Sequence, residues 1–365
     1  MRKFFCAIFS ISLIFLLCGF GQNFALKLTI VTSWGNFDYF VDKNDCFYGV
    51  ASNSYVENLA EKIVKERKIN PVESKAIFNL KNKTVSFSKE VCGYEIDKES
   101  LVEKINVALS LGGGEIFADY RVIKPKYTKQ ELSEKISLRS EFFTNFSNNF
   151  DRINNIILAT KSINSSVVLP NQVFSFNKVV GERSEKRGYK NAKIILNGQF
   201  VDGVGGGVCQ VSTTLYNAVL LAGLKIEEAH RHSVAVNYVE QSFDAMVSGD
   251  LIDLKFKNVT KFPIYIFGGV DKNRVAFYVF GEKSDVKYKK QSVITGKIEG
   301  KVQYVVNESL AEGEKRIISP PKNGFYSQGY LLAFKNGQLI SKEKIRSDVY
   351  NAVDGITEVK KIEDI

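Results

Sequence analysis

Apolar residues at helical and alternating spacing predict a mixed α/β domain over residues 26–130. Val56, Leu59 and Ile63 fall on one face of a helix that Asn70-Pro71 ends. A second helix opens with Asp97 as its cap and ends at a run of three glycines. Alternating residues predict the strands. The predicted elements are helices at 55–66 and 97–111, strands at 83–91 and 115–122, and a linker at 124–126.

A second group of patterns predicts an α+β domain over residues 135–275. Helical spacing predicts one helix over 141–161 and another that starts near Cys209 and ends at Gly223. The residues that carry this spacing are Phe142, Phe146, Ile153 and Ile156 in the first helix and Val211, Leu215, Ala218 and Ala222 in the second. Alternation predicts strands at 173–177, 192–196, 200–201 and 229–236, with the turn Asn197-Gly198 joining the middle two.

The remaining residues, 290–365, predict a small all-β module. Short apolar runs separated by turn residues are typical of strands, and Asn336-Gly337 is a strong hairpin turn. The predicted strands lie at 305–306, 316–319, 330–334 and 339–346. No pattern in this module indicates catalysis, so we expect it to act as a spacer or an adhesive. The whole chain is therefore expected to be α+β and multidomain.

The first 25 residues have the layout of a secretory signal peptide. A basic start, Arg2-Lys3, precedes an apolar run to about Phe20, and we expect cleavage near Ala25. An uncleaved membrane anchor is the alternative. The rest of the chain is ordinary globular sequence, with 44% hydrophobic and 25% charged residues. We therefore expect an exported protein of the cell envelope.

Cysteine usage and net charge narrow the chemistry of an exported protein. Cys6 and Cys18 fall in the leader, which leaves Cys46 and Cys92 as a possible disulfide pair and Cys209 as a free thiol. The alternative is three buried, unreactive thiols. The net charge of +10 suits anionic wall polymers, while no basic block interleaved with aromatics indicates nucleic-acid binding.

Cys209 and the only two histidines of the chain form the candidate reactive site. Cys209 follows three glycines at the start of a predicted helix, where the helix dipole and free backbone N–H groups favour a thiolate. His230 and His232 lie on the predicted strand 229–236, so both imidazoles project to one face. A cysteine activated by a histidine is suited to acyl transfer.

Two features of this candidate site stay open in the sequence. Asp244, Asp250 and Asp253 all follow the histidines, and any of them could orient the imidazole. His-x-His with a Cys or an Asp is also a zinc-ligand pattern, although only one cysteine lies near and no second ligand pair follows. We expect no metal and no cofactor.

The sequence words of the middle domain resemble the VanW family. PNQVFSFNKVVGERSEKRGYKNA, VGGGVCQVSTTLYNAVLLAGL, HRHSVAVNY, FDAMV and DLKFKN follow one another in order. Residues 26–130, with GYEIDKESLVEKINVAL, resemble a peptidoglycan-binding-like domain, and SLAEGEKRIISPP and LAFKNGQLISKEKI resemble a G5 module. The resemblance implies a link to glycopeptide resistance and, for some members, cysteine L,D-transpeptidase activity on peptidoglycan.

The resemblance and the chemistry together predict the roles of the site residues. Cys209 is the predicted nucleophile, His232 the first choice for the base with His230 second, and Asp244 the orienting residue with Asp253 behind it. We expect backbone N–H groups of the glycine loop and the helix start, at Gly206, Gly207 and Gln210, to hold the oxyanion. The hydroxyls of Ser212 and Thr213 could bond locally or contact substrate.

The predicted substrates are peptidoglycan stem peptides and glycan. The alternative function is a non-catalytic protein of the cell envelope that binds peptidoglycan or glycan, in which Cys209 is structural. In that alternative Ser212 and Thr213 are ordinary hydroxyl residues at a helix start.

Overall fold

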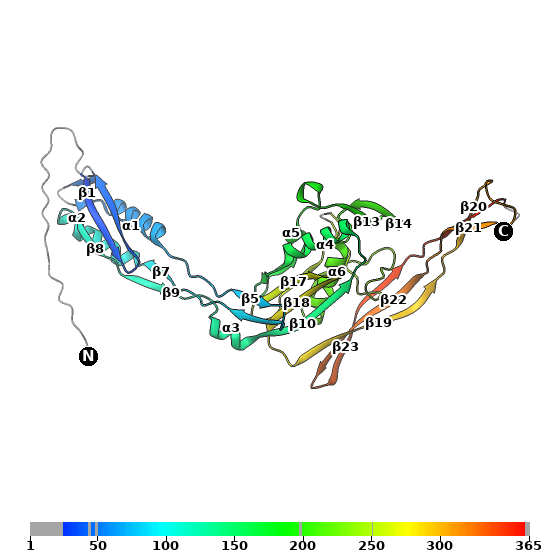
Figure 1. Ribbon diagram of the computed structural model, residues 1–365. Coiled ribbons are helices and arrows are strands. Elements are labelled where there is room, and N and C mark those ends of the chain that lie inside the picture. Colours follow the sequence, from blue (N-terminus) through cyan, green and yellow to red (C-terminus); the bar gives the residue numbers. More distant parts are fainter. Residues whose placement is uncertain (1–24, 43–44, 48–49, 197–198, 250, 362–365) are drawn as a thin grey trace. The chain divides into compact units, whose positions relative to one another are not determined.

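The protein is described by a computed structural model over residues 25–42, 45–47, 50–196, 199–249 and 251–361 (Figure 1). The predicted leader lies outside these residues except for Ala25. Two compact units divide the chain: the first holds residues up to 73 together with 90–126, and the second holds 74–89 together with residues from 127 onward. No helix in the described ranges is long and apolar enough to cross a bilayer.

The first unit is a small sheet covered by two helices. Strand β1 (Ala25–Thr32) pairs antiparallel with β2 (Gly35–Asp42) and parallel with β8 (Gly114–Phe117). Both predicted helices are confirmed, as α1 (Asn53–Arg67) and α2 (Lys98–Ser110), and Asp97 caps α2. The unit also contains β3 (Cys46–Phe47), β4 (Val50–Ala51), β7 (Gly93–Ile96) and β9 (Tyr120–Ile123).

The buried apolar residues of the first unit form one core. Leu28 and Ile30 of β1 face Val56 and Ile63 of α1 and Leu101 of α2, and all five are fully buried. Cys92, just before β7, is half-buried and carries a free thiol. The possible Cys46–Cys92 disulfide is therefore not formed.

The second unit is built around a four-stranded antiparallel sheet in the order β10-β18-β17-β11. The strands are β10 (Ile136–Asn145), β11 (Ser166–Val168), β17 (Ile264–Asp271) and β18 (Arg274–Glu282). Successive side chains of a strand point to opposite faces, and in this sheet both sets are apolar. Both faces are therefore covered by other elements. Helices α4 (Phe150–Ile163) and α6 (Val208–Leu221) pack on one face, over Ile264, Ile266, Phe277 and Val279.

A hairpin formed by residues 76–87 covers part of the opposite face. Its strands β5 (Ala76–Asn79) and β6 (Thr84–Phe87) lie against β10 together with the short helix α3 (Lys129–Lys135). Phe78 of the hairpin stacks on Phe267 of the sheet with ring centroids 4.8 Å apart. Residues 74–89 therefore belong to the second unit although the chain around them belongs to the first.

The predicted helix over 141–161 is wrong in its first part, because residues up to Asn145 continue strand β10. The four-residue spacing of Phe142 and Phe146 imitates a helix. In the structure Phe143 is exposed and Phe142 packs against the core, which is the alternation of a strand paired with β18. The helix begins at Phe150 because the Asn149 side chain caps it.

Smaller elements complete the framework of the second unit. Strands β12 (Val173–Ser175), β16 (Lys255–Lys257) and β15 (Lys225–Glu228) form a second sheet, and α5 (Phe176–Val180) follows β12. The predicted hairpin is confirmed as β13 (Asn191–Leu196) and β14 (Gln199–Val204), while its turn, 197–198, lies outside the described residues.

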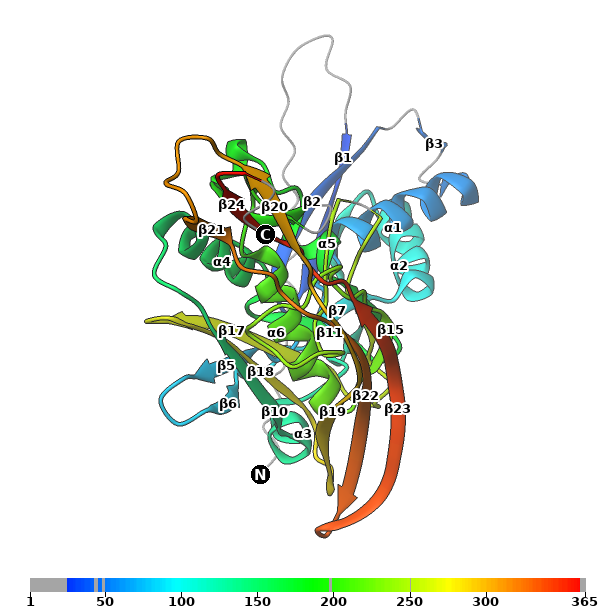
Figure 2. The same cartoon turned by 90° about the vertical axis from the view of Figure 1, so that its right-hand side faces the viewer.

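The C-terminal residues form two sheets, as the predicted all-β module requires. The long strands β19 (Val286–Ile298), β22 (Gly324–Lys335) and β23 (Gln338–Tyr350) lie side by side (Figure 2). Asn336 and Gly337 both have positive φ, as expected for a two-residue hairpin turn. The other sheet of this C-terminal module contains β20 (Val302–Val306), β21 (Lys315–Ser319) and β24 (Gly355–Val359).

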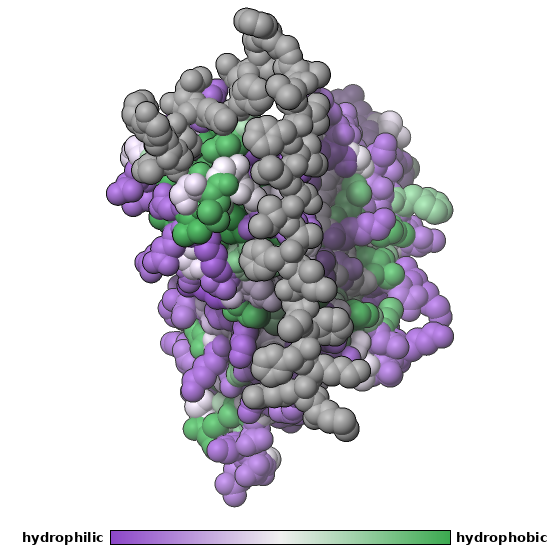
Figure 3. All heavy atoms as spheres, turned by 90° about the vertical axis from the view of Figure 1, so that its left-hand side faces the viewer, coloured by the Kyte–Doolittle hydropathy of each residue, from purple (hydrophilic) through white to green (hydrophobic). Residues whose placement is uncertain are grey.

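The exposed surface agrees with a folded, solvated protein. In the face shown in Figure 3, hydrophilic residues cover most of the coloured surface and apolar residues form separate groups.

Leu331 and Ile345 of the C-terminal module pack against the core that contains α6, so this module is joined to the helix-covered sheet by apolar contacts.

Candidate active site

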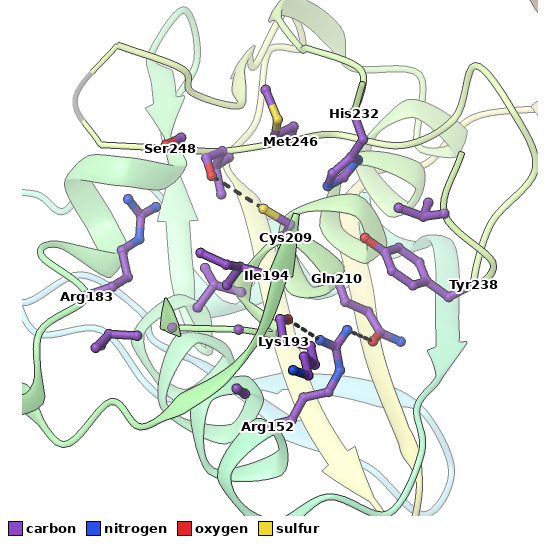
Figure 4. Close-up of a pocket in the computed structure, with 18 of the residues that line it drawn as sticks. Arg152, Arg183, Lys193, Ile194, Cys209, Gln210, His232, Tyr238, Met246 and Ser248 are labelled. Carbon is purple, nitrogen blue, oxygen red and sulfur yellow. Dashed lines mark hydrogen bonds between the residues drawn. The ribbon is translucent and has the colours of Figure 1, made fainter. Parts of the chain in front are cut away.

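A cleft of about 1620 Å³ opens at the N-terminal end of α6 (Figure 4). Its walls come from the glycine loop before α6, from β13, and from the irregular segment 230–249. This volume exceeds the range typical of pockets for small ligands and suits an extended chain molecule. Cys209 and His232 both line it.

The glycine loop places Cys209 in the first turn of α6. Gly207 is the N-cap and has a φ of 110°, which residues with a side chain rarely adopt. Gly206 lies so close to Ala192 of β13 that a Cβ would be 2.7 Å from its carbonyl carbon. The two glycines are therefore required for the backbone path, which directs Cys209 into the cleft.

The thiol of Cys209 has an environment that favours the thiolate. Burial raises its pKa, but the hydrogen bond and positive charge of His232 outweigh burial and lower the pKa overall. The Sγ atom lies 3.4 Å from the carbonyl oxygen of Val247. In Figure 4 the imidazole of His232 is directed toward this sulfur.

His232 is buried and fixed by Asp244. The Nδ1–H of the imidazole donates to Oδ2 of Asp244 over 2.7 Å, and the backbone N–H of His232 donates to the same oxygen over 2.6 Å. Burial lowers the pKa of His232, but Asp244 and Cys209 raise it more, to about 9. Because Nδ1 is bound to Asp244, Nε2 is the nitrogen available to the thiol.

Cys209, His232 and Asp244 thus form a thiol–imidazole–carboxylate arrangement. The lowered pKa of the thiol and the raised pKa of the imidazole favour an ion pair of thiolate and imidazolium near neutral pH. A nucleophile beside a base that a third group orients is the arrangement that activates cysteine for acyl transfer.

The predicted strand over 229–236 is wrong, and with it the prediction that both imidazoles share one face. Residues 231–236 form no strand, and the only ladder contact in this part is the single bridge between His230 and Met246. His230 is largely exposed and its Nε2 lies 3.0 Å from Glu228. The backbone departs from a strand because His232 N–H binds the Asp244 carboxylate instead of a neighbouring strand.

Among the described candidate aspartates, Asp244 alone contacts a histidine. Asp253 accepts hydrogen bonds from Ser175 Oγ and from the backbone N–H of Asn177, over 2.5 and 2.9 Å, and so holds the start of α5. Asp250 lies outside the described residues.

The side chains of Gln210, Ser212 and Thr213 make hydrogen bonds inside the protein. Gln210 is buried and donates to the Asn145 carbonyl over 2.7 Å while accepting from Arg152 over 3.0 Å. Ser212 and Thr213 are fully buried, and each bonds to the backbone of Ala245. Ser212 and Thr213 attach α6 to the segment that carries Asp244, which is the local bonding that the sequence left open beside substrate contact.

The backbone of the glycine loop also differs from the prediction in one respect. The N–H of Gln210 donates to the carbonyl of Gly207 over 3.0 Å, and the N–H of Val208 donates to Gly205 over 3.1 Å. Both donors are already satisfied, so the Gln210 amide is not available for an oxyanion.

Sequence reasoning missed the positive charge of the cleft. The described lining residues include one acidic side chain, Glu182, and four basic side chains from four different segments, Arg152, Arg183, Lys193 and Arg231. Tyr238 also lines the cleft, and burial raises the pKa of its hydroxyl, so this group stays protonated. No spacing in the sequence could have grouped residues that only tertiary folding brings together.

No group of three or more His, Cys, Asp or Glu side chains in the described residues is placed to hold a metal ion. The zinc pattern in the sequence therefore has no corresponding ligand set in that part of the chain. The Nε2 of His230 is engaged with Glu228 at 3.0 Å.

The comparison with family models assigns two domains. Residues 151–280 match the family described as VanW like protein, and residues 289–359 match the G5 domain. The chain carries a VanW-like domain followed by a C-terminal G5 domain, which confirms both resemblances. Domains of these kinds are typical of proteins of the cell surface and envelope. The resemblance of residues 26–130 to a peptidoglycan-binding-like domain stays a prediction.

Two curated relatives are homologous to this chain. It is 42% identical over 178 residues to the uncharacterized protein YoaR of Bacillus subtilis (strain 168), covering 48% of this chain and 58% of YoaR. It is 30% identical over 139 residues to the vancomycin B-type resistance protein VanW of Enterococcus faecalis (strain ATCC 700802 / V583), covering 36% and 50%. The matched region thus spans somewhat more than half of YoaR and half of VanW.

Among solved structures, the G5 domain of an IgA1 protease is similar to part of the chain. It is 22% identical, covers 21% of this chain and 89% of that domain, and has a TM-score of 0.16.

Proposed function

We propose that the protein is a cysteine acyl transferase of the L,D-transpeptidase type that cross-links peptidoglycan stem peptides. The observation that carries this proposal is the arrangement of Cys209 at the start of α6, His232 buried beside it, and Asp244 bonded to the imidazole. The relative named for vancomycin resistance supports an assignment to the cell wall.

In the first step the thiolate of Cys209 attacks the carbonyl that joins the third residue of a donor stem peptide to its terminal D-residue. The C–S bond forms, the amide C–N bond breaks, and the imidazolium of His232 gives its proton to the departing amine. The product is a thioester on Cys209, and the D-residue leaves as a free amino acid.

In the second step the amine of a neighbouring stem peptide attacks the thioester. His232 takes a proton from that amine, the C–S bond breaks, and a new amide links the two stems. Because Gln210 N–H is occupied, we assign the oxyanion to the backbone N–H groups of Gly207 and Cys209, at the N-terminus of α6.

The size and charge of the cleft support a peptide substrate. A volume of about 1620 Å³ accommodates more than one residue on each side of the thiol. The surplus of basic residues, with Arg152, Arg183, Lys193 and Arg231 against Glu182, suits a donor that carries carboxylates.

The test is incubation of the purified protein with disaccharide-tetrapeptide, followed by mass spectrometry. We expect a cross-linked dimer and a thioester on the peptide that contains Cys209. Cys209→Ala should abolish both, while Cys92→Ala, which removes a free thiol that does not line the cleft, should leave both unchanged.

Absence of product with the wild-type protein, or equal product with Cys209→Ala, contradicts the enzyme proposal. Retained binding of the protein to isolated cell walls in that case would favour the non-catalytic alternative, in which the same domain only binds peptidoglycan.

A further inference from the structure

We infer that the C-terminal G5 module is part of the reactive centre, because its residues Tyr350 and Arg346 act as positioning residues for Asp244. This inference deepens the proposed function and rests on the same thiol and histidine. It gives the module a role beyond that of a spacer or an adhesive.

The first contact comes from Tyr350, the last residue of β23. Its hydroxyl donates to Oδ1 of Asp244 over 2.5 Å and accepts from the backbone N–H of Ser242 over 2.8 Å. Tyr350 is 1% exposed and Asp244 is also 1% exposed, so no water competes for this bond. Asp244 therefore binds His232 through one carboxylate oxygen and the C-terminal module through the other.

The second contact comes from Arg346, four residues earlier on the same strand. Its Nη1 donates to the backbone carbonyl of Asp244, and its Nη2 lies 3.6 Å from Oδ1 of that residue. Arg346 is held in turn by Asp348, with Nε 3.0 Å from Oδ2. The guanidinium supplies the positive charge that stabilises a buried carboxylate on the side away from His232.

The segment that carries Asp244 is held by the module at every second residue. Glu240 forms an ion pair with Lys290 of β19 at 2.6 Å, and the Ser242 hydroxyl lies 2.8 Å from that of Ser327 on β22. Asp244 follows with its bonds to Tyr350 and Arg346. Residues 240–243 form a turn, in which Phe243 N–H donates to the Glu240 carbonyl over 3.2 Å and Ser242 has a φ of 68°. This turn directs Glu240, Ser242 and Asp244 to the module.

The chemical consequence concerns the imidazole. A carboxylate fixed on both oxygens has one orientation, and so has the imidazole bonded to it, which keeps Nε2 directed at the thiol. Without the module, Asp244 would keep its bond to His232 but lose the partners that fix its own position. The VanW-like domain is therefore incomplete as a reactive site without the residues that follow it.

The test uses Tyr350→Phe in the full chain and measures alkylation of Cys209 by iodoacetamide as a function of pH. Mass spectrometry of the peptide that contains Cys209 separates this thiol from the other cysteines. We expect the rate at pH 7 to fall about tenfold and its midpoint to move to higher pH, because the imidazolium that stabilises the thiolate is less well held.

The matched control is Tyr326→Phe. It makes the same change in the same module at an exposed position on β22, so the rate and the midpoint should equal those of the wild type. An unchanged pH profile in folded Tyr350→Phe would overturn the inference, since a purely structural role changes only the melting temperature.

A spectroscopic reading is available because the chain has two histidines. In Tyr350→Phe the imidazole resonances of His232 should titrate at a lower pH than in the wild type, where its pKa is about 9. If Tyr350→Phe does not fold, Arg346→Gln and Arg346→Lys replace it, and we expect slower alkylation in the first and partial recovery in the second. Wild-type rates in both would equally overturn the inference.

The outcomes distinguish this inference from the proposed function. Slower alkylation of Tyr350→Phe with no cross-linked product from the wild type would mean that the positioning role holds and acyl transfer does not. Cross-linked product together with unchanged alkylation would mean the reverse.

Discussion

The two walls of the cleft are built in different ways. The wall that carries Cys209 is local: the glycine loop and the first turn of α6 are contiguous in sequence and set the thiol position by backbone geometry. The wall that carries His232 is irregular, and it is held by side chains from Asp244 and from the module about one hundred residues later. The reactive pair thus joins a thiol whose position is fixed by local structure to an imidazole whose position is fixed by tertiary contacts. Substitutions in the two walls should therefore have different effects on stability and on thiol reactivity.

Removing the base should have the largest effect. In His232→Gln we expect cross-linking to fall by about 10²- to 10⁴-fold, because both proton transfers lose their group. In the wild type, activity should fall as pH drops through the lowered pKa of Cys209 and as it rises through the pKa of His232 at about 9. In the variant, the alkylation midpoint of Cys209 should move up toward about 8.5, the ordinary thiol value. An unmoved midpoint would show that His232 does not sustain the thiolate.

Asp244→Asn changes the wall that carries His232, at the residue that holds the imidazole. We expect the alkylation rate of Cys209 at pH 7 to fall by about ten- to a hundredfold, because the imidazolium loses its buried counter-charge. The free energy of unfolding should fall by about 3 kcal/mol, since His232 and Arg346 lose the buried carboxylate that they share. Urea unfolding and alkylation measure the two effects. Asp253→Asn is the control: it removes another buried carboxylate, which should lower stability without changing the pH profile.

Gly207→Ala disturbs the backbone of the glycine loop in the wall that carries Cys209. A Cβ at this position would lie 3.0 Å from Ile156 and 3.1 Å from Arg152, and φ is 110°. We expect the free energy of unfolding to fall by about 2 kcal/mol. The alkylation midpoint of the remaining folded protein should stay near the wild-type value, because His232 and Asp244 are untouched. Gly269→Ala, where a Cβ meets nothing within 4 Å, should cost much less. Equal losses would contradict the role of Gly207.

His230→Gln should have the smallest effect. The side chain is exposed and its partner Glu228 also binds Lys255, so we expect a change under about 0.5 kcal/mol in stability and none in the alkylation profile. A loss of thiol reactivity in this variant comparable to that of His232→Gln would reverse the assignment of the two histidines.

The wall that carries Cys209 could be predicted from the sequence, whereas most of the contacts that hold the wall with His232 could not. Helix α6 and the position of Cys209 follow from apolar spacing and glycines, both of which are local. The segment around His232 alternates like a strand, but its backbone N–H is satisfied by Asp244, a contact that periodicity does not encode. Residues 141–145, the end of strand β10, read as the start of a helix for a related reason: Phe142 and Phe146 fit both periods, and only pairing with β18 decides between them.

The same distinction explains which residues of the site were found. Asp244 was the first choice among three candidate aspartates that follow the histidines, and its contact with His232 agrees with that choice. Tyr350 and Arg346 gave no signal, because they belong to a module whose own pattern indicates only strands. For Ser212 and Thr213 the sequence leaves local bonding and substrate contact both open, and helical geometry turns their side chains into the protein.

The hairpin of residues 76–87 has a practical consequence for anyone who dissects this protein. A fragment that begins after residue 126 would contain the whole VanW-like domain and the G5 domain, yet it would lack the strands that cover one face of the central sheet. Phe267, Tyr278 and Phe280 would lose their contacts with the ring of Phe78. An exposed aromatic surface of this kind favours aggregation. We expect such a fragment to aggregate on expression, whereas a chain that starts at residue 25 keeps both units whole and should remain monodisperse.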